Sequence, residues 1–331
     1  MNSFGRLFRI SIFGESHGES VGIVVDGCPA GMPLTVDDFL PDLERRKGGT
    51  QKGTTPRQEE DLPIFKSGIF NNRTTGAPIT ILFENKNIRS GDYEKQRDVP
   101  RPGHADFVAH KKFAGFEDYR GSGHFSGRLT VALVAAGVIA KKILKEIKIT
   151  SSILEIGGEK DLDKGLQKAI DQKDSIGGIV ECRAEGLPIG LGEPFFDSAE
   201  SMLSHMVFAI PAVRGIEFGT GFAAAKMFGS EHNDAIENME GRTRTNHAGG
   251  IVGGLTNGNE LIFRIAIKPT SSTPKEQNTL NWETGKVENS SVKGRHDLCI
   301  ALRVPVVLEA VTAVVLADLM MLEQRIPRIN S

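Results

Sequence analysis

The stretch GESHGESVGIVVDGCPAG, residues Gly14–Gly31, predicts a buried strand that follows an unusually polar turn. Its apolar run Val21–Val25 is closed by the acid and proline turn Asp26-Gly27-Cys28-Pro29, which is typical of a strand and the turn that ends it. The residues before the run, Glu15-Ser16-His17, place an imidazole between two glycines, where a ligand can approach the backbone closely. A histidine in an ordinary turn explains these residues equally well, so the rest of the chain has to decide.

A near-copy of this strand lies in the second half of the 331-residue chain. Ser175–Ile189 (SIGGIVECRAEGLPI) aligns without a gap with Ser20–Leu34 (SVGIVVDGCPAGMPL), and Thr256–Lys268 resembles Thr75–Lys86. Such self-similarity indicates a duplicated unit. Because the copy lacks the Ser-His pair, we expect the duplication to be structural and the chemistry to be asymmetric.

Two long apolar segments are predicted to be buried helices. Leu129–Glu146 is hydrophobic on nearly every side, which is typical of a helix covered on most faces, and Pro305–Arg325 occupies the same place in the second half. We therefore expect an α+β fold, a β-α-β sandwich in which internally duplicated antiparallel sheets enclose a layer of long helices. The chain is predicted to be one domain, residues 1–331, with pseudo-repeat halves of about 1–150 and 151–331.

Composition limits the partners and the compartment. The net charge is −2 and aromatic residues are only 6%, so we expect no nucleic-acid or membrane partner, and any anion site must be built locally. The three cysteines, Cys28, Cys182 and Cys299, lack CxxC spacing and indicate reduced core residues. The N-terminus does not resemble a signal peptide, and no run is expected to reach the ~18 apolar residues of a membrane span. These features predict a cytoplasmic protein.

Several polar, glycine-rich stretches predict anion-binding sites. Gly48–Asp61 sets cations among glycines and threonines, a composition that suits phosphate capture. Gly121–Arg128 (GSGHFSGR) opens a buried helix and therefore offers backbone N–H groups and the positive end of the helix dipole. Lys268–Ser272 (KPTSS) ends a strand with a cation and three hydroxyls. Solvated loops and plain turns are the alternative explanation of all three.

These blocks together resemble one family, the chorismate synthases. The resemblance covers nearly the whole chain and rests on Gly14–Gly31, Gly121–Ala140 and Gly294–Ala310, with support from RPGHAD at Arg101–Asp106, NHAGGIVGG at Asn246–Gly254 and KPTSS. It implies a lyase that converts 5-enolpyruvylshikimate 3-phosphate to chorismate by 1,4-anti elimination of phosphate, the last step of the shikimate pathway of aromatic amino acid biosynthesis. It also implies reduced FMN as cofactor, NADPH as the reductant in certain members, and a homotetramer, although the apolar strands fit a dimer edge equally well.

The resemblance implies roles position by position. His17 matches the family histidine that acts on the departing phosphate, with Ser16 beside it, and His104 matches the histidine that protonates or stabilises the reduced flavin. Asp297 matches the acid near flavin N5 that relays the C6 hydrogen, and Ser126 matches a serine of the hydrogen-bond relay. The FMN-contact positions are His124, Phe125, Ser126, Pro211, Ala212, Gly253, Lys268, Pro269, Thr270, Ser271, Ser272 and Arg295. The cations expected to hold the phosphate of the substrate or of NADP are Arg46, Lys52, Arg57, Arg101 and Arg128.

The chain departs from the family pattern at several of these positions. It reads HFSGR at His124–Arg128 where many members read RSSAR, so we expect contacts there to be made by backbone atoms. Lys52 stands where arginine is common, which loses bidentate binding, and Pro211 replaces an asparagine. Thr273–Ser290 is expected to be a shortened loop.

Two other functions are weighed against this hypothesis. A metal-dependent phosphatase or lyase would use His17, His104 and Asp297 as ligands, but no HxH or HExxH spacing supports it, and no metal is expected. An RNA- or nucleotide-binding module would use the Arg45–Arg57 segment, and the net charge and the scarcity of aromatics argue against it.

Overall fold

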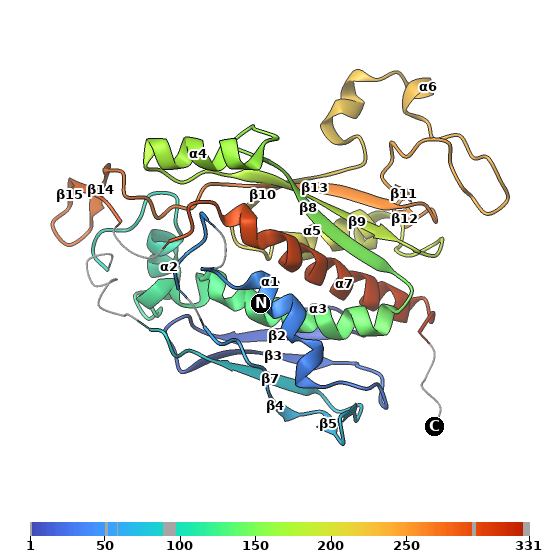
Figure 1. The fold of residues 1–331 in the computed structure, drawn as a ribbon, viewed down its shortest axis with the longest axis horizontal. Coiled ribbons are helices and arrows are strands. Elements are labelled where there is room, and N and C mark those ends of the chain that lie inside the picture. The colour runs from blue at the N-terminus through green and yellow to red at the C-terminus, as the bar shows by residue number, and fades with distance from the viewer. Residues whose placement is uncertain (1, 50–51, 58, 89–96, 293–295, 327–331) are drawn as a thin grey trace.

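The computed structural model describes residues 2–49, 52–57, 59–88, 97–292 and 296–326. Two antiparallel sheets lie on either side of a layer of helices (Figure 1). The first half contains β1 (Ser3–Phe4), β2 (Arg9–Gly14), β3 (Ser20–Asp26), α1 (Leu40–Arg46), β4 (Ile64–Ser67), β5 (Ile69–Phe70), β6 (Arg73–Thr74), β7 (Ile79–Glu84), α2 (Asp106–Phe113) and α3 (Thr130–Leu144). The second contains β8 (Lys148–Ile156), α4 (Leu162–Gln172), β9 (Gly178–Glu185), α5 (Ala199–Val207), β10 (Val213–Phe218), α6 (Gly229–His232), β11 (Ile251–Val252), β12 (Leu255–Thr256), β13 (Leu261–Ile267), β14 (Gln277–Asn281), β15 (Lys286–Ser290) and α7 (Val304–Leu322).

The helical layer is held together by α3 and α7. Helix α3 packs on β3 and β7 of the first sheet, α7 packs on β8 and β9 of the second, and the two helices pack against each other. They cross so closely that a Cβ on Gly137 would lie 2.3 Å from the Cβ of Ala310. Both helices run in the same direction in Figure 1, so their N-termini lie at the same end of the molecule. The α+β sandwich predicted from the sequence is confirmed.

The duplication extends to strand order and pairing register. The first sheet has the order β1-β2-β3-β7-β4, and the second has β8-β9-β13-β10, which repeats β2-β3-β7-β4. Ile23 pairs with Ile81 in the first sheet, and Cys182 pairs with Phe263 in the second. The gapless sequence alignment, which matched Asp26 with Glu181, is therefore wrong in register. The residues that close the second copy of the strand are Glu185-Gly186-Leu187-Pro188.

One buried threonine fixes the turn in each half. Thr74 Oγ1 donates to the carbonyl of Pro29 at 2.6 Å and accepts from the backbone N–H of Met32 at 3.0 Å. Thr256 repeats both bonds, donating to the carbonyl of Pro188 at 2.6 Å and accepting from a backbone N–H at 2.9 Å. Both threonines are buried, so each satisfies a buried N–H and a partly buried carbonyl of its turn.

The segment Ile300–Leu322, which includes α7, is the one helix of the described chain that is long and apolar enough to span a membrane by length and composition. The expectation that no run reaches this length is therefore wrong. Of its most apolar window, 78% is buried within the protein, because α7 lies between α3 and the second sheet. Two-sided packing explains why this helix is hydrophobic all round.

The segment Thr273–Ser290, expected to be a shortened loop, contains the hairpin β14–β15. Trp282 N donates to Asp98 O at 3.0 Å, and Thr279 Oγ1 donates to Pro100 O at 3.1 Å. These bonds attach the hairpin to the irregular segment before α2. The sequence pattern missed the hairpin because its strands are polar on both faces.

The repeated threonine predicts a matched pair of stability changes. Thr74→Val and Thr256→Val each leave a partly buried carbonyl and a buried N–H without the threonine hydroxyl, so each lowers the free energy of unfolding by about 1–3 kcal/mol. Denaturant unfolding of the two variants measures this loss, and Thr75→Val, at an exposed neighbouring threonine, is the control with little expected effect. Equal stability of Thr256→Val and wild type would contradict the role assigned to the repeat.

Candidate active site

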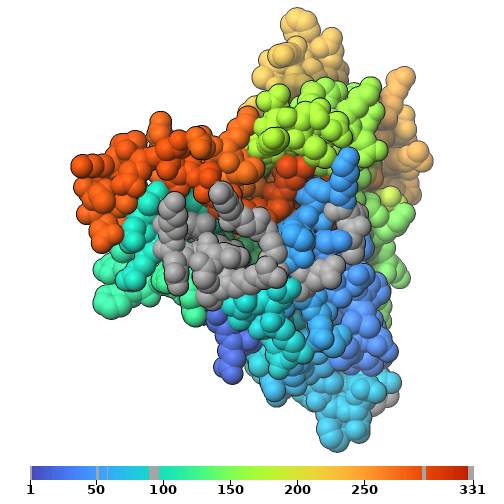
Figure 2. Space-filling model, turned by 60° about the vertical axis from the view of Figure 1, so that its left-hand side comes forward, coloured from blue at the N-terminus to red at the C-terminus, as the bar shows by residue number. Residues whose placement is uncertain are grey.

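A cavity of about 330 Å³ opens at the end of the molecule where α3 and α7 begin. Its wall includes the segment η4 (Gly127–Leu129) that precedes α3, and residues of η7 (Ile300–Arg303) that precede α7. In Figure 2 the orange surface that follows β13, the teal surface around α2 and the blue surface near α1 meet at this end of the molecule. The positive ends of two buried helices are therefore directed towards one cavity, which favours an anionic ligand.

Most of the residues predicted from the sequence line this cavity. They come from both halves of the chain, and they are Ser16, Arg46, Arg57, Arg101, His104, Phe125, Ser126, Arg128, Pro211, Ala212, Lys268, Pro269, Thr270, Ser271, Ser272 and Asp297. The predicted FMN contact Arg295 lies outside the described residues. The loops that the sequence motifs predicted to bind ligands therefore build the cavity wall, and the fold brings them together at one end of the sandwich.

Two predicted residues lie behind the cavity wall. His17 is only 5% exposed, and its ring packs closely against Gly121, where a Cβ would lie 2.4 Å from His17 Cδ2. Gly121 also has a φ of +57°, so only glycine fits this position without strain. The His124 ring is within hydrogen-bond distance of Gly14 O at 2.8 Å and of Asn2 Oδ1 at 3.2 Å. His124 thus binds its loop to the end of β2, while its neighbour Phe125 lines the cavity.

Two other predicted residues lie away from the cavity of this chain. The exposed Lys52 contacts Gln167 Oε1 of α4 at 3.3 Å. Gly253 forms the turn between β11 and β12, at the right of Figure 1, whereas α2 and the hairpin β14–β15 lie at the left. Neither residue reaches the cavity wall within one chain.

His104 is held in one tautomer by a charged pair. Its Nδ1 lies 2.6 Å from Asp106 Oδ1, and Arg101 binds both carboxylate oxygens of Asp106 at 2.8 Å. Burial would raise the pKa of Asp106, but hydrogen bonds from Arg101 and His104 lower it well below its ordinary value. Arg101 Nη2 also lies 3.0 Å from Nδ1, but the ionised carboxylate is nearer and only accepts. We therefore assign the proton to Nδ1 and the lone pair to Nε2.

The imidazole of His104 is neutral at neutral pH. Burial lowers its pKa, the hydrogen bond to Asp106 opposes this, and the positive charges of Arg101 and Lys268 lower it further. A bound anion beside this ring would favour its protonated form. His104 is therefore placed to gain a proton when the cavity is filled by negative charge.

Two arginines of the cavity wall share one buried carboxylate. Asp61, whose side chain is inaccessible to solvent, binds Arg46 Nη2 at 2.5 Å and also pairs with Arg128 Nη1. Burial would raise the pKa of Asp61, but the charges and hydrogen bonds of the two arginines hold it below its ordinary value. The Nε of Arg46 is buried and has no hydrogen-bond partner among the described residues. Such an orphaned donor in the wall fits an anionic ligand.

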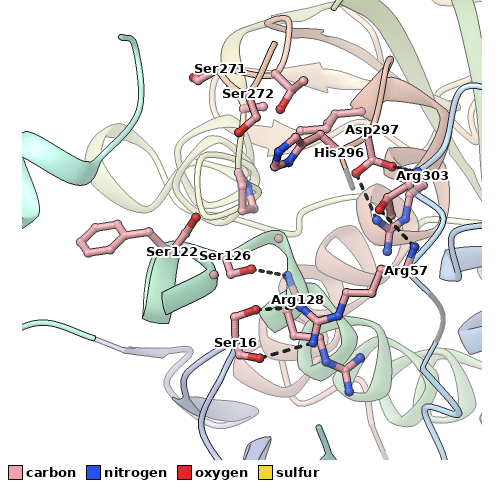
Figure 3. A pocket seen from close by; sticks show the side chains of 18 of the residues that line it. Ser16, Arg57, Ser122, Ser126, Arg128, Ser271, Ser272, His296, Asp297 and Arg303 are labelled. Atoms are coloured by element: carbon pink, nitrogen blue, oxygen red, sulfur yellow. Dashed lines mark hydrogen bonds and ion pairs between the residues drawn. The ribbon is translucent and has the colours of Figure 1, made fainter. Parts of the chain in front are cut away.

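Asp297 is oriented by residues of both halves. Its Oδ1 accepts from Thr55 N at 2.9 Å, and its Oδ2 pairs with Arg303 Nη1 at 3.2 Å (Figure 3). Burial and the charge of Arg46 lower the pKa of Arg303, whose Nε donates to the carbonyl of Arg46 at 2.9 Å. The carboxylate therefore sits between the Gly48–Asp61 loop and the start of α7.

The loop Lys268–Ser272 is bound to the loop that carries His104. Lys268 Nζ donates to Gly103 O at 2.6 Å and to Ser271 Oγ at 2.8 Å, and Arg101 Nη1 donates to Ser272 Oγ at 3.0 Å. Burial lowers the pKa of Lys268, and the nearby Arg214 lowers it further. A cation and several hydroxyls thus face the same cavity from the second half of the chain.

The charge of the wall identifies the kind of ligand. Among the described residues it carries seven Lys or Arg and three Asp or Glu side chains, although the whole chain has a net charge of −2. Within the same part of the chain, no group of three or more His, Cys, Asp or Glu residues is arranged to hold a metal ion. The site is built for an anionic organic ligand.

The sequence pattern missed the partners that orient these groups. Asp61 and Asp106 stood at the ends of quoted motifs, and their acidic character beside arginine was the available signal. Asn85 gave no local signal, because its contact with Arg128 joins segments far apart in the chain. Arg303 lies inside the Gly294–Ala310 block and pairs with Asp297 of the same block, but the motif did not single it out.

The fold and the cation-lined cavity define the class of this protein, an enzyme that acts on a small molecule. The chain matches the family model described as chorismate synthase over residues 8–321. A chorismate synthase of Chitinophaga pinensis is 71% identical over 330 residues, covering 99% of each chain, and one of Dehalococcoides mccartyi is 45% identical and also covers 99% of each. A solved crystal structure of a chorismate synthase superimposes with a TM-score of 0.74 at 25% identity, covering 97% of this chain and 93% of that one.

This chain belongs to the chorismate synthase family. The resemblance read from the sequence motifs is confirmed.

The His104–Asp106 pair predicts a measurable shift in pKa. Asp106→Asn removes a negative charge that raises the pKa of His104, so the pKa of the imidazole falls further below its ordinary value. Titration of the histidine-labelled apoprotein by two-dimensional NMR measures this pKa, with the resonance assigned through His104→Asn. Asp174→Asn is the control, since Asp174 is paired with Lys275. An unchanged or higher pKa of His104 in Asp106→Asn would show that Asp106 does not set it.

Proposed function

We propose that this enzyme converts 5-enolpyruvylshikimate 3-phosphate to chorismate by 1,4-anti elimination of phosphate, with reduced FMN as cofactor. The observation that supports this most directly is the excess of fixed cations in the cavity wall, which suits a substrate with a phosphate and two carboxylates. The family match supports the same reaction. The product places the enzyme at the end of the shikimate pathway of aromatic amino acid biosynthesis, and the reaction makes it a carbon–oxygen lyase.

The donor set of the wall fits a flavin mononucleotide. Lys268 and the hydroxyls of Thr270, Ser271 and Ser272 offer a cation and donors for a phosphate or a ribityl chain, and Phe125 offers an aromatic face. The C6–H of the substrate is barely acidic, so a side-chain base alone faces a high barrier. When bound, reduced FMN would supply a transient electron that helps to expel phosphate, and this electron would return to it as the C6 hydrogen leaves as a proton.

The residues of the chain bind, orient and move protons around these groups. Arg46 and Arg128 hold the anionic groups of the substrate, and Ser16, whose Oγ accepts from Arg57 Nη1 at 3.1 Å, lies beside the departing phosphate. His17 lies directly behind Ser16 and supplies the proton to the leaving group. His104 gains a proton on Nε2 and then stabilises the negative charge of the reduced cofactor. Asp297, held by Arg303, accepts the C6 hydrogen as a proton.

We also propose a compartment, a further relay residue and a reductant for this enzyme. The charge and composition support a cytoplasmic enzyme with no nucleic-acid or membrane partner. We propose Ser126 as a member of the hydrogen-bond relay, since its Oγ accepts from Arg128 N at 3.3 Å in the cavity wall. NADPH is tested as the reductant of FMN in the second arm of the assay below.

The proposed reaction predicts phosphate release that depends on the redox state of FMN. An anaerobic assay with chemically reduced FMN should release phosphate, and oxidised FMN should not; a second, aerobic arm supplies NADPH as the sole reductant. His17→Ala and Asp297→Asn should lower kcat by roughly 10²–10⁴-fold, because each removes a proton-transfer group, while FMN and substrate still bind. Equal phosphate release with oxidised FMN, or unchanged kcat in both variants, would rule the proposal out.

We also propose that the active form is a homotetramer. Figure 1 shows the segment around α6 projecting from the sandwich, and it exposes large apolar side chains: Phe222 is 83%, Phe228 78% and Met239 98% exposed. Such a patch on one chain indicates a surface covered by another copy. Gly253, a predicted flavin contact far from its own cavity, supports a site completed by a second copy.

Light scattering tests the assembly. The wild-type protein should have four times the chain mass of 35.9 kDa, and the double variant Phe222→Ser, Phe228→Ser should form smaller species because it removes apolar area from the interface. Phe70→Ser, which changes an aromatic that is 70% exposed in the short hairpin β5–β6, is the matched control and should leave the mass unchanged. A monomeric wild-type protein would contradict the proposal.

A further inference from the structure

The amide side chain of Asn85 joins the His17 loop to the arginines of the cavity. Asn85 directly follows β7 and is 8% exposed. Its Nδ2 donates to Glu15 O at 3.0 Å and to Gly18 O at 2.9 Å, so both amide protons bind the carbonyls on either side of Ser16-His17. Its Oδ1 accepts from Arg128 Nε at 2.9 Å. Every hydrogen-bonding group of this side chain except one lone pair is therefore used.

These contacts require an amide at position 85. The two carbonyls accept only donors and the guanidinium of Arg128 only donates, so the orientation of the amide is fixed by its neighbours. An aspartate of the same shape would place a carboxylate oxygen against two carbonyl oxygens. A leucine would leave the carbonyls of Glu15 and Gly18 without these donors.

The same guanidinium continues the connection to the anion-binding cations. Arg128 pairs with the buried Asp61, and Asp61 binds Arg46. Arg128 Nη2 also donates to Glu84 O at 3.2 Å, the residue immediately before Asn85. One chain of buried bonds thus runs from Arg46 through Asp61, Arg128 and Asn85 to the backbone around His17.

Other bonds hold the His17 loop at single points, among them those from Arg57 Nη1 to Ser16 Oγ at 3.1 Å and from Arg57 Nη2 to Ser16 O at 3.4 Å. Gly18 N donates to Glu15 O at 3.1 Å, Ser16 N donates to Gly123 O at 3.0 Å, and Asn85 N donates to Glu19 O at 3.1 Å. Asn85 differs from these groups because its one side chain binds the carbonyls at both ends of the Ser16-His17 segment. The imidazole of His17 packs against Gly121, so it has no space to move in that direction. A small displacement of the loop therefore changes the position of this imidazole.

We propose that Asn85 is a positioning residue that fixes the His17 loop relative to Arg128, so that the proton donor and the substrate-binding cations keep one geometry. The proposal rests on the function proposed above, because it assigns His17 a part in the reaction. Asn85 itself lies outside the cavity wall, so it acts on the position of His17 and does not contact the substrate. Misplacement of this loop lowers the rate of the chemical step more than it lowers the affinity for the substrate.

Asn85→Asp is the main test, and Asn259→Asp is the matched control. Asn259 is also an amide that bridges backbone groups, donating to Gly241 O at 3.1 Å and accepting from Thr243 N at 3.1 Å, but it lies outside the cavity wall. The first measurement is amide hydrogen exchange of the apoprotein, followed by mass spectrometry on the peptide that contains residues 14–19. The second is kcat and KM in the anaerobic assay with chemically reduced FMN.

The expected result separates positioning from a general loss of stability. Asn85→Asp should exchange faster in residues 14–19, and its kcat should fall roughly 10- to 100-fold while KM changes little, because Arg46 and Arg128 still bind the substrate. Asn259→Asp should match wild type in both measurements. If Asn85→Asp does not fold, Asn85→Ser, which keeps one donor, should show the same changes to a smaller extent.

Either measurement can overturn the proposal. It is wrong if a folded variant at position 85 keeps wild-type exchange in residues 14–19, or if its kcat equals that of wild type. An inactive wild-type enzyme would contradict the proposed function instead, and in that case the exchange experiment alone decides whether Asn85 fixes the loop.

Discussion

The close crossing of α3 and α7 is the constraint on which the rest of the structure depends. Gly137 and Ala310 bring the two backbones together, and any Cβ at Gly137 would overlap Ala310. Each sheet is covered by one of these two helices, and the two helices also pack on each other. This explains why both helices are apolar on nearly all sides, and it places both N-termini at the same end of the molecule.

That shared end determines where a charged site can form. The loops before α3 and α7 carry Arg128 and Arg303, so cations from both halves meet in one cavity. Like charges at such distances repel, and the structure compensates by giving each arginine a carboxylate partner, Asp61 for Arg128 and Asp297 for Arg303. The remaining excess of positive charge is balanced only when an anionic ligand binds. A protein with a net charge of −2 can in this way bind an anion strongly at one place.

The sequence predicted the layers of the fold because burial leaves a periodic pattern. Continuous apolar runs identified α3 and α7, and the copy of Ser20–Leu34 identified the duplication. The pairing register was missed, since a gapless alignment weighs residue types and carries no information about hydrogen bonds. In the site, the wall residues were predicted from their motifs. Their orienting partners Asp61 and Asn85 depend on contacts that only the folded chain creates, and local patterns do not record them. Asp106 stands two residues after His104 in the quoted motif, so only its contact geometry had to come from the structure.

The corrected register changes how the asymmetry of the two halves is explained. Counted back from the strand turn, Ser175 and Ile176 fall at the places of Ser16 and His17. In both halves the segment before the strand is bonded to the segment before the long helix, through Ser16 N to Gly123 O and through Ile176 N to Leu298 O.

The serine is therefore retained in the second half, and the imidazole is replaced by an aliphatic side chain packed on the core. Ser175 Oγ donates to Thr270 O at 2.7 Å, which fixes the Lys268–Ser272 loop in the cavity wall. The second copy has not lost its connection to the site. It holds the loop that faces the ligand, and the first copy carries the histidine.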